Sequence, residues 1–409
     1  MKMIKVLVIL LLFTKMGYSQ NPDDLVMAKS IKINSKVLDE ERTLYISTPT
    51  DYANSEESYP VMYVLDGYIG VIGLVNNLSS ISLCPEMIVV VIEQIIPGKD
   101  LFPSNPKYMK GLHPAKPWYN KKEDNELELT PPCEICGQAD KYLSFIETEL
   151  IPFVDKNYRT LPYRICSGHS MGGLCVTHAF LSHTSMFTAY IALSPSLYWD
   201  DGLLLRTEEE KLAGKNLKYK QFYFSIGGRE GPSTIGDAHE FAKTLKLKVS
   251  TDLRWKLDYM ENEDHGSGAP IGIINGLRFI YDGWKYDYDI MMAGGILAID
   301  NFYKNLSERL GYEISPEVGN FNSIGQGLLI DGYQEEAMKI FEENTRRHPN
   351  SPDAYRYLAQ GYLKADNLDM AIKTYEKAVE LATILKNANL EFLKSRLESV
   401  KAEKNKVKP

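Results

Sequence analysis

Short apolar runs recur along the chain up to about residue 260, and most are separated by segments long enough to hold a helix. The runs are VMYVLDG, MIVVVIEQI, RICSGHS, TAYIALSP, QFYFSIGG and RWKLDYME. Strands that alternate with crossover helices form a parallel sheet covered by helices on both faces. The sequence therefore predicts an α/β fold with a doubly wound, mostly parallel sheet. Residues 30–49 come first and alternate in polarity around Leu38 and Asp39, which predicts a hairpin.

The pattern changes beyond about residue 310, where strand-like runs stop and helical periodicity takes over. Two segments there align at a fixed offset of 34 residues, with these pairs of small or aromatic residues: Gly327/Gly361, Ala337/Ala371 and Phe341/Tyr375. That period resembles tetratricopeptide repeats. We expect a small all-α repeat domain over residues 316–409, capped by a helix from Thr383 to Lys404. A generic helical bundle is the alternative.

The N-terminus has the pattern of an export signal. Lys2 and Lys5 precede eight apolar residues, and Gly17 and Ser19 stand just before Gln20. Eight residues are too few to span a bilayer, which needs roughly 20. We expect a signal peptide over residues 1–19 and a periplasmic or secreted protein, with an uncleaved membrane anchor as the alternative. The hydrolase-like domain would then cover residues 20–290, and a linker helix residues 291–315.

The charge and the cysteines restrict the partners. The formal net charge is −8, and the only charged residues among residues 1–19 are lysines, so cleavage makes the net charge more negative. A negative net charge disfavours nucleic acid and anionic membrane surfaces as partners. Among the five cysteines, Cys133 and Cys136 form a lone C-x-x-C without the second pair that a zinc site needs. A disulfide within this loop is expected in an oxidising compartment, and a redox pair or free thiols are the alternatives.

One connection is unusually long. Residues 97–132 contain seven prolines together with Tyr108, Trp118 and Tyr119. Structureless stretches of this length inside a domain are commonly lids or binding loops, although plain surface insertions also occur. The segment ADKYLSFIETELIPFVDKNY follows and predicts a helix.

Ser170 lies in the pattern G-x-S-x-G, between Gly168 and Gly172, directly after a predicted strand and before a predicted helix. A serine nucleophile at such a turn adopts a strained backbone so that its hydroxyl stands clear of the sheet. Side chains two residues away on either side would collide, which explains the two glycines. An ordinary glycine-rich turn is the alternative. A serine hydroxyl is inert at neutral pH without a base, so this hypothesis requires a histidine.

His265 is the expected base among the seven histidines, because it follows the last predicted strand on a polar loop. His169, His178 and His183 lie beside the serine and on its helix, where we expect them to be buried or to point elsewhere. Glu230, after FYFSIGG, is the leading candidate for the acid. The order serine, acid, histidine is that of the α/β-hydrolase fold. Asp237 and Asp264 are the competing acids.

The tetrahedral intermediate of an ester requires hydrogen-bond donors aimed at its oxyanion. The amide of Met171, the residue after the nucleophile, is one expected donor. The second would be the amide of Tyr68, because Gly67 allows the backbone to turn there. The alternative reading of LDG is a simple strand end.

Five motifs occur in order: YPVMYVLDG, GQADKYLSFIETELIPFVDKNYR, SGHSMGGL, FTAYIALSPSLYWD and EDHGS. Together they resemble the "Putative esterase" family of α/β-hydrolases, which includes siderophore, feruloyl and acetyl-xylan esterases and S-formylglutathione hydrolases. The resemblance covers residues 28–286. It implies that Ser170 is the nucleophile, His265 the base and a residue after FSIGG the acid, and that Ser194, Pro195 and Trp199 shape the site.

Two positions depart from the family pattern. Lys99 stands where members often carry arginine, and Tyr68 after LDG is often another residue. These departures bear on the substrate and leave the chemistry unchanged.

The sequence thus predicts an exported serine esterase without metal or organic cofactor. The expected substrate is an acylated sugar, a feruloyl ester or a siderophore lactone, in contact with Tyr198, Trp199 and Trp118. The repeats would bind a protein partner. No nucleic acid is expected as a partner, and no membrane once the signal is cleaved. The alternatives are a catalytically idle scaffold acting through its repeats, or an acyltransferase.

Overall fold

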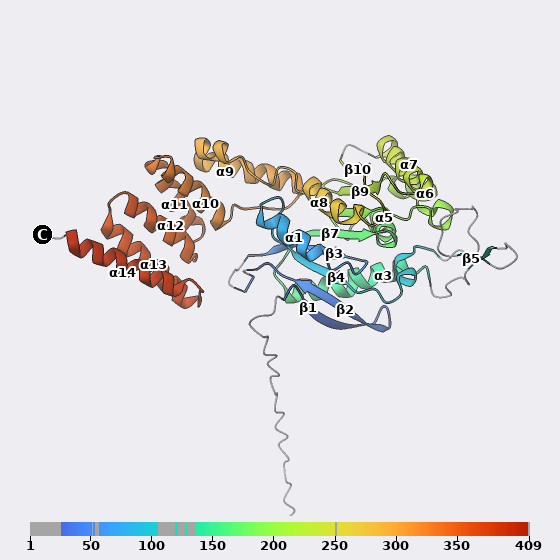
Figure 1. The fold of residues 1–409 in the computed structure, drawn as a ribbon, viewed down its shortest axis with the longest axis horizontal. Helices are drawn as coiled ribbons and strands as arrows, with labels where there is room; N and C mark the ends of the chain where they lie inside the picture. Colours follow the sequence, from blue (N-terminus) through green and yellow to red (C-terminus); the bar gives the residue numbers. More distant parts are fainter. Residues whose placement is uncertain are drawn as a thin grey trace, which may run out of the picture.

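The computed structural model describes residues 26–50, 52–53, 57–104, 119–121, 127–129, 136–249 and 252–407. The expected signal peptide lies outside these residues. Figure 1 shows two parts, one built around a sheet and one made of helices that extends from it toward the C-terminus.

An eight-stranded sheet organises the first part, in the order β1-β2-β4-β3-β7-β8-β9-β10. Its strands are β1 (Lys29–Ser35), β2 (Glu40–Ser47), β3 (Tyr59–Val64), β4 (Ile88–Ile92), β7 (Thr160–His169), β8 (Ala189–Leu193), β9 (Gln221–Gly227) and β10 (Arg254–Met260). Strands β1 and β2 form the expected hairpin, with Asp39 at a positive φ of 59° in its turn. Strands β1, β2 and β4 pair antiparallel, and the other neighbours pair parallel. The predicted mostly parallel α/β sheet is therefore confirmed.

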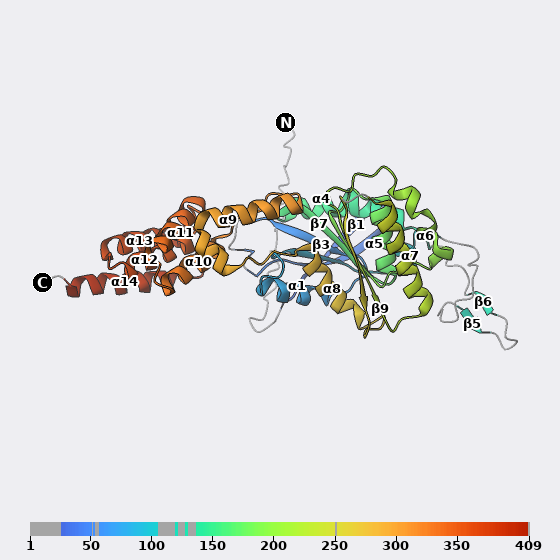
Figure 2. The ribbon, with the colours of Figure 1, turned by 90° about the horizontal axis from the view of Figure 1, so that it is seen from above.

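Helices cover both faces of this sheet (Figure 2). One core cluster joins the sheet to α3 (Ala139–Phe145), η1 (Ile146–Leu150), α4 (Ile151–Asn157), α5 (Met171–Ser182), α6 (Trp199–Leu212) and α7 (Pro232–Lys248). The opposite face packs on α1 (Val71–Ser80) and α8 (Gly268–Ile280). Every residue of β3, β4, β8 and β9 is buried, which explains why these strands read as continuous apolar runs.

The helix expected over residues 139–158 is interrupted by a π-helical turn, η1. Pro152 follows in the first turn of α4 and has no N–H to donate to the preceding turn. A π-helical turn is a common way to accommodate such a break within a helix.

The second part consists of α9 (Tyr288–Leu310), α10 (Val318–Ile330), α11 (Gln334–Arg347), α12 (Pro352–Lys364), α13 (Leu368–Ile384) and α14 (Leu390–Val407). Helices α12 and α13 begin 34 residues after α10 and α11, as the expected repeat requires. Ala337, Ala371, Phe341 and Tyr375 are all fully buried. The two helical hairpins fit the repeat pattern, and their assignment as tetratricopeptide repeats stays a prediction.

The expected capping helix differs in its start. Thr383 belongs to the last turn of α13, and the chain then turns through Lys386 at a φ of 52°. The amide of Asn387 donates back to the carbonyl of Ala382, which closes α13 before α14 begins at Leu390.

The expected linker helix corresponds to α9, which is bent at Gly295. It packs against both parts of the molecule. Its middle residues, such as Ile299 and Leu306, share a core cluster with α10 and α11. At its C-terminal end, Leu310 is buried in the core of the sheet part, and Tyr312 lies with its ring centroid 5.0 Å from that of Tyr163. The core of the sheet part therefore extends beyond residue 290.

The long connection is described only in part. It contains α2 (Pro97–Leu101) and a short antiparallel pair, β5 (Tyr119–Lys121) and β6 (Leu127–Leu129). Its predicted role as a lid stays a prediction, and Trp118 and Cys133 lie outside the described residues.

Cys136 is disulfide-bonded, whereas Cys84, Cys166 and Cys175 are free and buried. Within the described ranges, no helix has both the length and the apolar character needed to cross a membrane.

Candidate active site

Ser170 occupies the sharp turn between β7 and α5. Its backbone angles, φ 57° and ψ −112°, are strongly disfavoured for a residue with a side chain. The turn is held by the Ser170 amide, which donates to the carbonyl of Leu193 at 2.9 Å, and by the amide of Leu174, which donates to the Ser170 carbonyl at 3.0 Å. The expected strained turn from strand to helix is confirmed.

The flanking glycines are required by close approach. A Cβ at Gly168 would lie 2.5 Å from the carbonyl carbon of Gly172. A Cβ at Gly172 would lie 2.6 Å from Oδ2 of Asp66. Both contacts are too short for real Cβ atoms, so larger residues would displace the turn that presents Ser170.

The structure brings the three expected residues together in one hydrogen-bonded chain. Nε2 of His265 lies 3.0 Å from Oγ of Ser170, and Nδ1 of His265 lies 2.9 Å from Oε2 of Glu230. The Ser170 hydroxyl can donate to Nε2 only if the ring proton is on Nδ1, where Glu230 accepts it. In this arrangement the imidazole can act as a base toward the serine.

Glu230 is fixed by two further donors. Its Oε1 accepts from the hydroxyl of Ser194 at 2.7 Å and from the amide of Gly227 at 2.9 Å. Burial alone would raise the pKa of Glu230, but the hydrogen bonds from His265, Ser194 and Gly227 outweigh it and hold this pKa below its ordinary value. Glu230 is therefore ionised at neutral pH. Ser194, expected to shape the site, does so by holding the acid.

The competing acids have other positions. Asp264 accepts the amides of Gly266 and Ser267 with its Oδ1, at 2.9 and 2.8 Å, and so shapes the loop that carries His265. Asp237 lies within α7, and the carboxylate in contact with the His265 ring is that of Glu230. The geometry selects Glu230.

The two expected oxyanion donors differ. Met171 is the first residue of α5, where an amide has no acceptor within the helix and forms part of the positive end of the helix dipole. The amide of Tyr68 instead donates to Oδ1 of Asp66 over 3.4 Å, longer than an ordinary hydrogen bond. Its role toward an oxyanion stays a prediction.

Sequence reasoning missed two residues of the site, His169 and Asp66. Nε2 of His169 donates to the backbone carbonyl of His265 at 2.7 Å, and the two rings lie 4.6 Å apart between centroids. Burial lowers the pKa of His169, which favours its neutral form. Asp66 accepts the amide of His169, and burial raises the pKa of Asp66. The adjacency of His169 to the serine was the one signal in the sequence.

A cleft of about 520 Å³ opens at Ser170. Its described lining comprises Asp66, Tyr68, Gln94, Pro97, Leu101, His169, Ser170, Met171, Gly172, Gly266, Ala269 and Pro270. Tyr198 and Trp199 are not among these residues. Trp199 stacks on Phe102 with ring centroids 3.6 Å apart, and its Nε1 donates to the carbonyl of Ser104. It therefore supports the start of the long connection, and its predicted contact with substrate is not observed among the described lining residues.

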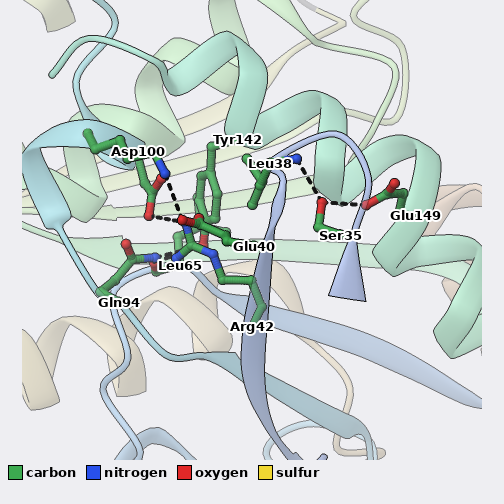
Figure 3. Close-up of polar contacts among 10 residues, drawn as sticks. Ser35, Leu38, Glu40, Arg42, Leu65, Gln94, Asp100, Tyr142 and Glu149 are labelled. Carbon is green, nitrogen blue, oxygen red and sulfur yellow. Dashed lines mark hydrogen bonds and ion pairs between the residues drawn. The ribbon is translucent and has the colours of Figure 1, made fainter. Parts of the chain in front are cut away.

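A buried polar network supports one wall of the cleft (Figure 3). Arg42, fully buried on β2, donates to Asp100 of α2 at 2.6 Å and also to Glu40. Nε2 of Gln94 donates to the hydroxyl of Tyr142 at 2.8 Å and to the carbonyl of Leu65.

Lys99, one of the two expected departures from the family pattern, pairs with Glu40 at 2.8 Å. This ion pair therefore helps to hold α2 on strand β2 of the sheet.

Comparison with known proteins identifies the family. A family model described as "Putative esterase" matches residues 35–266. Ferri-bacillibactin esterase BesA of Bacillus subtilis is 30% identical over 149 residues, which are 35% of this chain and 52% of BesA. The match thus spans about half the length of that relative.

Two solved structures are similar in fold. An IroE-like serine hydrolase from Shewanella oneidensis superposes with a TM-score of 0.67 at 26% identity, over 78% of this chain and 99% of that one. A protein from Capnocytophaga ochracea superposes with a TM-score of 0.58 at 16% identity, over 92% of this chain and 99% of that one, and so shares the fold into the helical part. Because the family model spans more than half of the 409 residues, the chain belongs to the "Putative esterase" family.

Proposed function

We propose that the protein is an exported serine esterase that hydrolyses carboxylic esters through an acyl-enzyme. The observation that carries this proposal is the chain from Glu230 through His265 to Ser170, at a strained turn that opens into the cleft. Family membership and the N-terminal export pattern support it independently.

In this mechanism Oγ of Ser170 attacks the ester carbonyl while Nε2 of His265 takes the hydroxyl proton. Glu230 stabilises the imidazolium by accepting its Nδ1–H. The amide of Met171 donates to the oxyanion, and the amide of Tyr68 joins it by turning away from Asp66. Collapse of the intermediate breaks the ester bond, and the alcohol leaves with the proton from His265. Water then attacks the acyl-enzyme while Nε2 of His265 takes its proton; the bond between the acyl carbon and Oγ of Ser170 breaks, the carboxylic acid leaves, and His265 returns the proton to Ser170.

A siderophore lactone is the substrate class that we favour. The relative BesA is named a ferri-bacillibactin esterase. Exposed apolar side chains, Tyr68, Ile69 and Ile96, stand at or beside the described lining and suit an ester with an apolar or aromatic group. Feruloyl esters and acetylated sugars are the classes to compare.

The test uses purified full-length protein and its Ser170→Ala variant. The wild type should release p-nitrophenol from short-chain esters, and a panel of siderophore lactones, feruloylated sugars and acetylated sugars should rank the substrates. The variant should lose about 10⁶-fold in kcat. Equal activity in both proteins would rule out the serine mechanism.

The C-terminal helical hairpins favour a second candidate, a scaffold whose hydrolase part is idle. A fluorophosphonate probe distinguishes the two, because an idle site would leave Ser170 unlabelled. An acyltransferase would form the same acyl-enzyme, and transfer of the acyl group to an added alcohol in preference to water would identify it.

A further inference from the structure

A second histidine–carboxylate cluster lies at the other end of α5. Nε2 of His178, in the last turns of the helix, is 2.7 Å from Oδ1 of Asp140 at the start of α3. Nε2 of His183, the residue that ends α5, is 2.9 Å from the same oxygen. Two imidazole nitrogens and one carboxylate thus converge on a single point between two helices.

The surroundings prepare these side chains to bind a cation. The side chain of His178 is only 5% exposed. Its other nitrogen, Nδ1, lies 3.4 Å from Oγ of Ser182, which accepts a hydrogen bond from Lys211. With a proton on Nδ1, His178 would donate to Ser182 and present a bare Nε2. Ligating histidines are oriented by such a bond from the second nitrogen.

We propose that Asp140, His178 and His183 form a binding site for a divalent transition-metal ion of the Zn²⁺ class. The three ligand atoms all lie within 4.8 Å of one another. Neighbouring ligands of a tetrahedral zinc ion are about 3.3 Å apart, given metal–ligand bonds of about 2 Å. Each nitrogen–oxygen distance would therefore widen by about half an ångström.

The exposed Asp140 side chain can supply this movement, because 66% of its surface is accessible. The His183 side chain, which is 24% exposed, can rotate to bring its Nε2 closer to that of His178. The same exposure lets the ion enter and water complete its coordination. Two imidazoles and a carboxylate favour zinc and its neighbours over Mg²⁺ and Ca²⁺, which prefer all-oxygen sites.

The bound ion would join α3 to α5, the helix that begins with the nucleophile. A helix of 12 residues is about 18 Å long, so the ion would stabilise the helix from a distance and would not touch the substrate.

The test measures zinc binding by full-length protein that has been treated with a chelator and dialysed. Calorimetry should give one zinc ion per chain, and Mg²⁺ at the same concentration should give no signal. Asp140→Asn and His183→Gln should each weaken zinc binding at least tenfold. His239→Ala, which removes an exposed histidine on α7, serves as the matched control and should bind zinc as the wild type does.

Thermal unfolding adds a readout that a hydrogen-bonding role alone would not change. Zinc should raise the Tm of the wild type and of His239→Ala, and at the same concentration should raise the Tm of Asp140→Asn by less. The proposal is overturned if the wild type does not bind micromolar zinc, or if both ligand variants bind it with unchanged affinity. Zinc lost only in His265→Ala would place the ion at the active site and would also overturn it.

Discussion

Each end of α5 carries a chain of serine, histidine and carboxylate. At the N-terminal end, Ser170, His265 and Glu230 are linked by distances of 3.0 and 2.9 Å. At the C-terminal end, Ser182, His178 and Asp140 are linked by 3.4 and 2.7 Å. Residue types and distances alone therefore do not distinguish the two hydrogen-bonded sets of side chains.

The backbone and the helix distinguish them. Ser170 stands on a strained turn beside a cleft, whereas Ser182 lies in the last helical turn and its Oγ accepts a hydrogen bond from Lys211. The amides at the N-terminal end of α5 favour an anion such as an oxyanion, and the carbonyls at its C-terminal end favour a cation. The same three residue types thus suit acyl transfer at one end and cation binding at the other.

The largest expected effect comes from removing the two serines in turn. Ser170→Ala should lower kcat for p-nitrophenyl esters by about 10⁶-fold, because the nucleophile is lost. Ser182→Ala should keep kcat within about twofold, because the distal chain takes no part in the reaction. Steady-state kinetics on both variants checks the contrast, and a comparable loss in Ser182→Ala would break it.

Replacing the acid should have the next largest effect. Glu230→Gln keeps the size of the side chain but removes the charge that stabilises the His265 imidazolium and selects its tautomer. We expect kcat to fall by about 10⁴-fold with little change in KM. Glu240→Gln, an exposed change on α7, is the matched control. Activity of Glu230→Gln near the wild-type value would exclude Glu230 as the triad acid.

The shape of the turn can be tested without touching the three residues. In Gly172→Ala the new Cβ would meet Asp66 at 2.6 Å and displace the turn, so kcat should fall by about 10²-fold. Gly236→Ala on α7 has no atom within 4 Å of its new Cβ. It should leave kcat unchanged and raise stability by about 0.5–1 kcal/mol. Equal kinetics in both variants would show that the close packing at Gly172 is not required.

The smallest expected effect concerns pH. The pKa of Glu230 is lowered in the folded protein, so its ionised form contributes stability above the ordinary glutamate pKa of about 4.3, and this contribution is lost as pH falls through the lower folded value. Glu230→Gln should therefore lower Tm at pH 7 by about 2–4 °C, the shift expected for about 1 kcal/mol. The difference should vanish in strongly acidic buffer. A difference that grows on acidification would contradict the sign of this pKa shift.

Much of the fold could be predicted because strands buried on both faces leave continuous apolar runs in the sequence. Ser170 and His265 could also be predicted, since a glycine-flanked serine and a histidine on a loop after a strand are local signals. The choice of Glu230 over Asp237 and Asp264 could not be settled, because chain order admits all three. In the structure, Glu230 is the carboxylate that contacts the His265 ring.

The remaining contacts depend on packing between distant segments. Asp66 lies beneath the turn only because β3 pairs with β7. Asp140 meets His178 and His183 only because the start of α3 packs beside the end of α5. No local pattern records these juxtapositions. Trp199 was expected at the substrate on the basis of a motif, but its ring is stacked on Phe102.

The C-terminal end of α9 sets a limit on how the protein can be divided. Leu310 is buried in the core of the sheet part, and Tyr312 and Ile314 pack against the same cluster. Proteolysis or truncation at residue 290 would strip these side chains away and leave an apolar surface open to water. The shortest fragment that keeps the sheet part intact should therefore end after Ile314. That end point lies within residues 291–315, which the sequence predicts to be only a linker.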